Sequence, residues 1–273
     1  MNFTSPLKLA LAHLTVLDVP PLQLVSLAAK TGYSSIGLRL YPAFPGSTFY
    51  ELPPGSAVLR EMQHKLQDEG MQVNDIEFIG IGEHFKPQQL AELLDTASAL
   101  GARSLSVCGD DPNRARLTAN FASLCDLAAP SGIRINLEYM AWRQVKNFDN
   151  ALDVVLSAGR KNGGVLIDAL HLFRTGGSPR DVHKAPPGVI HSVQLCDAVA
   201  LPPANLEASI NEGRSGRLPP GRGALPLQEL LTELPSETII SLEVPTNAPV
   251  NQEQHARAVF ESTQLLAASL KKG

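Results

Sequence analysis

Cysteine and positive charge are scarce in this sequence of 273 residues. Its three cysteines, Cys108, Cys125 and Cys196, are an odd number and lie far apart, so we expect reduced thiols rather than a disulfide framework. Lysines and arginines number 23 against 27 acidic residues, and the net charge of −4 indicates no surface for nucleic acid. We therefore expect a cytoplasmic protein with no nucleic-acid partner.

Long apolar runs are also missing. No run approaches the roughly 20 residues that span a bilayer, and the first residues lack the basic region and apolar stretch of a signal peptide. We therefore expect neither membrane insertion nor secretion. What the sequence does contain is 44% hydrophobic and 18% charged residues, a composition typical of a folded globular chain.

Short apolar runs alternate along the chain with stretches of helical periodicity. The predicted strands are residues 8–16, 35–40, 73–81, 104–109, 134–140, 165–170, 189–196 and 238–244. The predicted helices are residues 20–31, 57–69, 88–100, 115–129, 148–160 and 252–270, with a short one at 178–183. Apolar strands alternating with helices are typical of a parallel sheet buried on both faces. We predict a single (β/α)8 TIM barrel, formed as one domain by residues 1–273.

Four consecutive predicted strands carry a polar side chain near their carboxyl ends, where the active sites of such barrels form. These side chains are Glu138, Asp168, Gln194 and Glu243. Each carboxylate alone is equally well explained by a neighbouring arginine or lysine, but three together repel one another unless a divalent cation lies among them. A set of oxygen ligands suits Mn²⁺ or Mg²⁺ better than Zn²⁺.

Further candidates lie near the same strand ends. His171 follows Asp168 by three residues, and Arg174 follows His171 by three. This spacing places His171 just beyond the strand, and we favour a role in the site over a structural one. Arg39 and Glu77 interrupt the second and third strands. They either bind substrate or form a structural ion pair, with each other as one option.

Residues 198–223 form a long segment rich in proline, glycine and arginine. A stretch of this length without regular structure is usually functional or disordered. Its arginines Arg214, Arg217 and Arg222 indicate either a solvated loop or a lid that holds an anionic or polyhydroxy substrate. Trp142 and Phe44 follow the fifth and second strands, and they either line the pocket or cap the barrel rim.

These residues resemble the xylose isomerase-like barrel superfamily, which includes sugar-phosphate isomerases, ketose 3-epimerases, inosose dehydratase and 3-dehydroshikimate dehydratase. The resemblance covers nearly the whole chain and implies that Glu138, Asp168, Gln194 and Glu243 hold a divalent metal. Gln194 stands where many sugar epimerases have histidine, and some dehydratases have an amide there. The segments that carry the resemblance are Leu137-Glu138, Leu166-Ile167-Asp168-Ala169-Leu170-His171, Val193-Gln194-Leu195-Cys196-Asp197, Arg217-Leu218-Pro219-Pro220-Gly221-Arg222-Gly223 and Ser241-Leu242-Glu243-Val244.

The expected activity is a metal-dependent isomerisation or epimerisation of a keto-sugar, a sugar phosphate or a similar hydroxy-carbonyl compound, and the expected partner is a small polyhydroxy or keto-acid substrate. A hydroxyl beside a carbonyl chelates the metal, which stabilises the enediolate that forms when the neighbouring C–H proton leaves. Glu138 and Glu243 flank the metal set, so one removes the proton and the other returns it. His171 hydrogen-bonds a substrate oxygen, and Arg214, Arg217 or Arg174 binds a phosphate or carboxylate.

Three alternatives use the same scaffold. Loss of a β-hydroxyl from the same intermediate makes the protein a dehydratase of the dehydroshikimate or inosose type. A DNA-repair nuclease needs more histidine ligands and a basic groove, which this sequence lacks. A non-catalytic barrel that binds a ligand is the remaining alternative. Barrels of this superfamily often pair, so a homodimer is one expectation.

Overall fold

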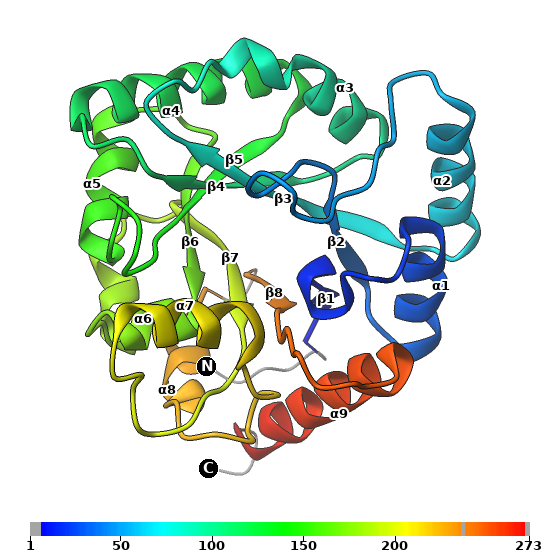
Figure 1. Cartoon of the computed structure of the whole chain (residues 1–273), viewed down its shortest axis with the longest axis vertical. Helices are drawn as coiled ribbons and strands as arrows, with labels where there is room; N and C mark the ends of the chain where they lie inside the picture. The colour runs from blue at the N-terminus through cyan, green and yellow to red at the C-terminus, as the bar shows by residue number, and fades with distance from the viewer. Residues whose placement is uncertain (1–6, 236–237, 271–273) are drawn as a thin grey trace.

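Eight parallel strands form a closed barrel in which β1 pairs with β8, and the helices lie in a ring outside it (Figure 1). The computed structural model describes residues 7–235 and 238–270. This architecture is the predicted TIM barrel. The strands are β1 Leu9–Leu11, β2 Ser35–Arg39, β3 Gln72–Ile81, β4 Ser104–Gly109, β5 Arg134–Glu138, β6 Gly163–Asp168, β7 Ile190–Leu195 and β8 Ile239–Leu242.

Side-chain caps begin several of the helices, because a helix leaves its first N–H groups without partners. The capping side chains that accept a first-turn N–H include Ser56, Asn113, Asn147, Asp168, Asn205 and Asn251. The helices are α1 Pro21–Thr31, α2 Ala57–Asp68, α3 Ala91–Ala99, α4 Arg114–Ala128, α5 Phe148–Ala158, α6 Ala169–Arg174, α7 Leu206–Ser215, α8 Leu227–Glu233 and α9 Gln252–Leu270.

The first strand is much shorter than predicted. β1 ends at Leu11, and residues His13–Val16 form a 3₁₀ turn in place of the expected continuation to residue 16. The turn is fixed by its polar side chains: the Thr15 hydroxyl donates to the Leu242 carbonyl at 2.8 Å, and Arg39 N–H donates to His13 Nδ1. An apolar run alone does not distinguish a strand from such a turn.

Three further predictions are corrected in the second half of the barrel. β6 ends at Asp168 rather than at residue 170, and α6 begins at the next residue; the expected short helix at 178–183 is a 3₁₀ turn, Pro179–Lys184. The segment 198–223 is not without regular structure, because it contains α7. Asn205 caps this helix, accepting from Ala208 N–H at 2.9 Å.

The main core lies between the barrel and the surrounding helices, whereas part of the barrel interior is polar. A Cβ built on Gly37 of β2 would lie 2.4 Å from Glu77 Oε1 and 3.0 Å from Asp75 Oδ1. The bare glycine therefore makes room for two buried carboxylates from β3. Within the described residues, no helix combines the length and apolar character needed to cross a membrane.

Gly37→Ala should lower the free energy of unfolding by about 1–3 kcal/mol, because the added methyl group meets the Glu77 carboxylate. Chemical denaturation monitored by circular dichroism measures this loss. Gly80→Ala on β3 is the matched control, since a Cβ there has only Cys108 Sγ near it, at 3.9 Å. Equal stability of the two variants would contradict the expected crowding.

Candidate active site

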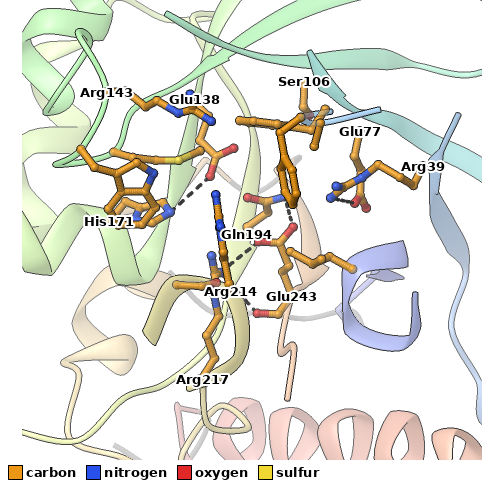
Figure 2. Close-up of a pocket in the computed structure, with 17 residues that line it drawn as sticks. Arg39, Glu77, Ser106, Glu138, Arg143, His171, Gln194, Arg214, Arg217 and Glu243 are labelled. Carbon is orange, nitrogen blue, oxygen red and sulfur yellow. Dashed lines mark hydrogen bonds and ion pairs between the residues drawn. The ribbon is translucent and has the colours of Figure 1, made fainter. Parts of the chain in front are cut away.

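One pocket opens at the carboxyl ends of the strands (Figure 2). Glu138 ends β5, Gln194 lies near the end of β7, and Glu243 follows β8 directly. All three line the pocket and are at least 95% buried. Asp168 is fully buried and lies behind the pocket lining. The predicted strand-end residues therefore converge at one place.

The guanidinium of Arg217 lies among these carboxylates. Its Nη1 is 2.5 Å from Asp168 Oδ2 and 3.1 Å from Glu243 Oε2, and its side chain is only 2% exposed. Arg217 Nε donates to the Gly213 carbonyl at 2.9 Å, which ties the cation to α7. The residue expected to bind substrate from a lid thus neutralises two members of the predicted metal set.

The Gln194 amide is oriented by Glu243. Its Nε2 donates to Glu243 Oε1 at 2.9 Å, as the dashed line in Figure 2 shows. This bond leaves the buried Gln194 Oε1 with no hydrogen-bond partner among the described residues. An unpartnered buried carbonyl oxygen carries a substantial free-energy cost unless a cation, water or ligand group meets it.

Glu138, Asp168 and His171 form a compact group at the other side of the site. Each offers a ligand atom, and these atoms lie within 4.8 Å of one another. His171 Nε2 is 3.6 Å from Glu138 Oε1, and His171 N–H donates to Asp168 Oδ1 at 3.1 Å. The position of His171 follows from α6, because Asp168 caps the helix that carries it three residues later.

Burial and neighbouring charges shift the pKa values of the titrating groups in different directions. Burial, together with repulsion from Glu243 and Asp168, raises the pKa of Glu138 well above its ordinary value. The pKa of Glu243 rises to about 8, mainly from burial. Burial alone would also raise the pKa of Asp168, but Arg217 and His171 lower it overall. Burial lowers the pKa of His171 to about 4, so its imidazole is neutral at pH 7.

The residues present fit a divalent cation. The unpartnered Gln194 Oε1 is a suitable oxygen donor, and neutral His171 is a suitable nitrogen donor. The raised pKa values of Glu138 and Glu243 show that these carboxyls lack sufficient compensating positive charge. The compact group shares Glu138 and Asp168 with the predicted ligand set and adds His171 to it.

Arg39 and Glu77 form the ion pair that was one of the two options left open, and they do so at the pocket wall. Arg39 Nη2 pairs with Glu77 Oε2 at 3.1 Å in a buried ion pair, and both residues line the pocket. Glu77 Oε1 also accepts from His13 N–H at 2.8 Å. Arg174 lies outside this pocket, because its guanidinium forms two hydrogen bonds with Glu212, at 2.7 and 2.9 Å.

The segment expected to form either a lid or a solvated loop contributes a helix, α7, to the wall of the pocket. Gly213 of α7 packs so closely on Trp142 that a Cβ there would lie 2.7 Å from the ring. The Trp142 ring also meets the His171 ring edge-on, with centroids 5.0 Å apart. Phe44 lies across the pocket under the Arg214 guanidinium, 4.8 Å from ring centroid to Cζ. Trp142 and Phe44 therefore line the pocket.

Among the polar residues that line the pocket, the sequence analysis missed Ser106 and Arg143. Ser106 lies within β4, and its hydroxyl donates to Asp75 Oδ2 at 3.0 Å. Arg143 follows β5 by five residues, and its Nη1 pairs with Asp110 Oδ2 at 2.7 Å. Arg143 is a cation shortly after a strand that ends in Glu138, and this position could have predicted that it lines the pocket. Nothing in the apolar pattern predicted that Ser106 lines the pocket.

Comparison with known proteins agrees with the barrel fold. A family described as xylose isomerase-like TIM barrel matches residues 25–265. The chain belongs to this family. The crystal structure of the IOLI protein with a bound zinc atom superposes with a TM-score of 0.78 at 18% identity, covering 97% of this chain and 99% of that one. A likeness at this identity shows the shared fold.

Curated relatives resemble parts of the chain. A 3-dehydroshikimate dehydratase of Pseudomonas aeruginosa is 36% identical over 118 residues, which are 43% of this chain and 18% of that protein. An inosose isomerase of Bacillus licheniformis is 28% identical over 150 residues, 52% of each chain. The matches thus span about half or less of each relative. The members of the family that resemble this chain are enzymes, and their reactions differ.

Arg217→Met should lower the free energy of unfolding by about 3–5 kcal/mol, because it leaves Asp168 and Glu243 as buried, unpaired acids. Added Mn²⁺ should raise the melting temperature of this variant more than that of the wild type, since the ion supplies the missing positive charge. Differential scanning fluorimetry with and without Mn²⁺ measures both effects. Arg222→Met, at an exposed position of the same segment, is the control. An equal response of all three proteins to Mn²⁺ would contradict this role for Arg217.

Metal affinity should rise with pH between 6 and 8. The carboxyls whose pKa values are raised, Glu138 and Glu243 with its pKa of about 8, must lose their protons to bind a cation. In the metal-free protein the same raised values stabilise the fold below about pH 4.5, and that contribution is lost as pH rises toward 8. Calorimetric titration with Mn²⁺ in buffers of different ionisation enthalpy measures the protons released. Glu243→Gln should release fewer protons than the wild type, and unchanged release would exclude this carboxyl.

Proposed function

We propose that this protein is a divalent-metal-dependent enzyme that removes the proton beside the carbonyl of a hydroxy-carbonyl substrate and returns it, as an isomerase or epimerase. One observation carries the proposal: at the pocket end of β5 to β8, three buried carboxyls converge with an amide oxygen that has no hydrogen-bond partner in the described part of the chain. The family and its isomerase relatives support it. Burial of such a set of polar groups lowers the stability of the fold, so its presence favours a functional role.

Glu138, Asp168, Gln194 and Glu243 are the proposed ligands, with His171 close enough to join them. When bound, a divalent cation supplies positive charge that stabilises the anion formed by proton loss beside a carbonyl. Asp168 already carries a negative charge, because Arg217 lowers its pKa below the ordinary value. Gln194 Oε1 is held in place by the bond from its own amide nitrogen to Glu243.

Glu138 is the proposed proton acceptor. Its carboxyl lines the pocket, and in the deprotonated state that binding of a cation requires, it is able to accept a proton. Glu243 approaches from β8, on the other side of Gln194, and is suited to deliver a proton to the opposite face of the substrate. Neutral His171 lies beside Glu138 and is available to hydrogen-bond a substrate oxygen.

Dehydration is the second candidate, favoured by two observations. Gln194 provides an amide where the resemblance allows dehydratases, and the relative that is 36% identical is a 3-dehydroshikimate dehydratase. The first step is the same in both reactions. Glu138, after it has accepted the proton, is then the group placed to protonate a departing β-hydroxyl.

Solvent exchange of the substrate proton tests the proposal. The wild-type protein with Mn²⁺ in D₂O, incubated with an inosose or with 3-dehydroshikimate, should exchange the C–H beside the carbonyl, as followed by proton NMR. Glu138→Gln should reduce this rate by about 10²–10⁴-fold, because it removes the base. Glu92→Gln, an exposed change on α3, should leave the rate unaltered.

The products separate the candidate reactions. Exchange with no loss of water supports an isomerase or epimerase, whereas a new near-ultraviolet absorbance supports dehydration to a conjugated acid. Failure of Glu138→Gln to slow exchange would remove Glu138 from its proposed role. Absence of any exchange together with no uptake of Mn²⁺ would leave the ligand-binding barrel as the explanation of the site.

A further inference from the structure

Among the arginines that line the pocket, Arg214 differs from the others. Each of the other three has a carboxylate partner, and within the described ranges Arg214 forms no ion pair. Its exposed guanidinium therefore remains available at the mouth of a pocket whose other cations are neutralised. The partnered pairs are Arg39 with Glu77, Arg143 with Asp110, and Arg217 with Asp168 and Glu243.

Three contacts hold Arg214 and the two residues before it in place. The Phe44 ring supports its guanidinium at 4.8 Å, an arrangement that leaves the N–H edge free to meet an anion. On α7, the neighbouring Glu212 is fixed by its two hydrogen bonds with Arg174. Gly213 is fixed by its close contact with Trp142. The cation is thus presented from a helix that is anchored directly before it, which lowers the entropy lost on binding.

We propose that Arg214, supported by Phe44, forms an anion subsite that binds a carboxylate or phosphate group of the substrate. The inference rests on the proposed function, because it assigns the anionic group to Arg214 and the reacting carbons to Glu138. Both side chains line the same pocket (Figure 2). The substrate class narrows accordingly from hydroxy-carbonyl compounds in general to those with an acidic group at one end. Guanidinium binds either anion through two parallel N–H bonds.

Fluorescence of the single tryptophan provides a binding test without turnover. Trp142 lines the pocket and is the only tryptophan of the sequence, so its emission reports on bound molecules. Dihydroxyacetone, dihydroxyacetone phosphate and hydroxypyruvate form a matched set of neutral, phosphorylated and carboxylated hydroxy-carbonyl probes. With Mn²⁺ present, the wild type should bind at least one anionic probe about tenfold more tightly than dihydroxyacetone.

Arg214→Gln should abolish most of that preference and leave the affinity for dihydroxyacetone unchanged, and Phe44→Leu should reduce the preference in part. Arg222→Gln removes the same charge from the same segment outside the pocket, and it should behave as the wild type. The anionic probe that loses more affinity identifies a carboxylate or a phosphate as the ligand.

Two outcomes would overturn the subsite: no preference for either anionic probe in the wild type, or equal loss of all three probes in Arg214→Gln. Because the readout is binding, these outcomes are distinct from a failure of proton exchange. A protein that binds anionic probes through Arg214 and exchanges no proton would keep the subsite and exclude the proposed reaction.

Discussion

The buried guanidinium of Arg217 is the interaction on which the arrangement of the site depends. It contacts Asp168 at the end of β6 and Glu243 after β8, and its Nε holds the Gly213 carbonyl of α7. One cation therefore joins two strands of the barrel to the helix that covers them. Buried carboxylates at this density are tolerated only where a positive charge lies among them. Helix α7 is thus connected to the acidic cluster through the polar contacts of Arg217 as well as by its own packing on Trp142.

The titrating groups around this cation divide into charged and neutral ones. Asp168, which it contacts most closely, has its pKa lowered, whereas burial raises the pKa of Glu138 and that of Glu243, although Glu243 also contacts the cation. His171 is buried next to both and is neutral at pH 7. Groups of similar chemistry thereby acquire different protonation states within one pocket. Such a separation of pKa values is what acid–base chemistry at neutral pH requires.

The barrel and its strand-end residues were predictable from sequence because buried parallel strands are nearly uninterrupted apolar runs. A polar residue ending such a run is conspicuous, and Glu138, Gln194 and Glu243 were found in this way. The end of β6 was harder to predict, since the apolar residues continue through Asp168 into α6 and fit either element. The place of Arg217 depends on contacts between residues 49 positions apart, for which no periodic pattern exists.

The junction of β6 and α6 contains no loop residue, because Asp168 both ends the strand and caps the helix. Successive residues of an α-helix are rotated by about 100° around its axis. A one-residue insertion or deletion at this corner would therefore turn His171 away from Glu138, whatever residue was added or lost. The connection from β2 to α2, which carries Phe44, is by contrast a long segment, residues 40–56, without a helix or strand. Relatives that differ in substrate are thus expected to vary in length at that connection and to keep the β6–α6 corner at constant length.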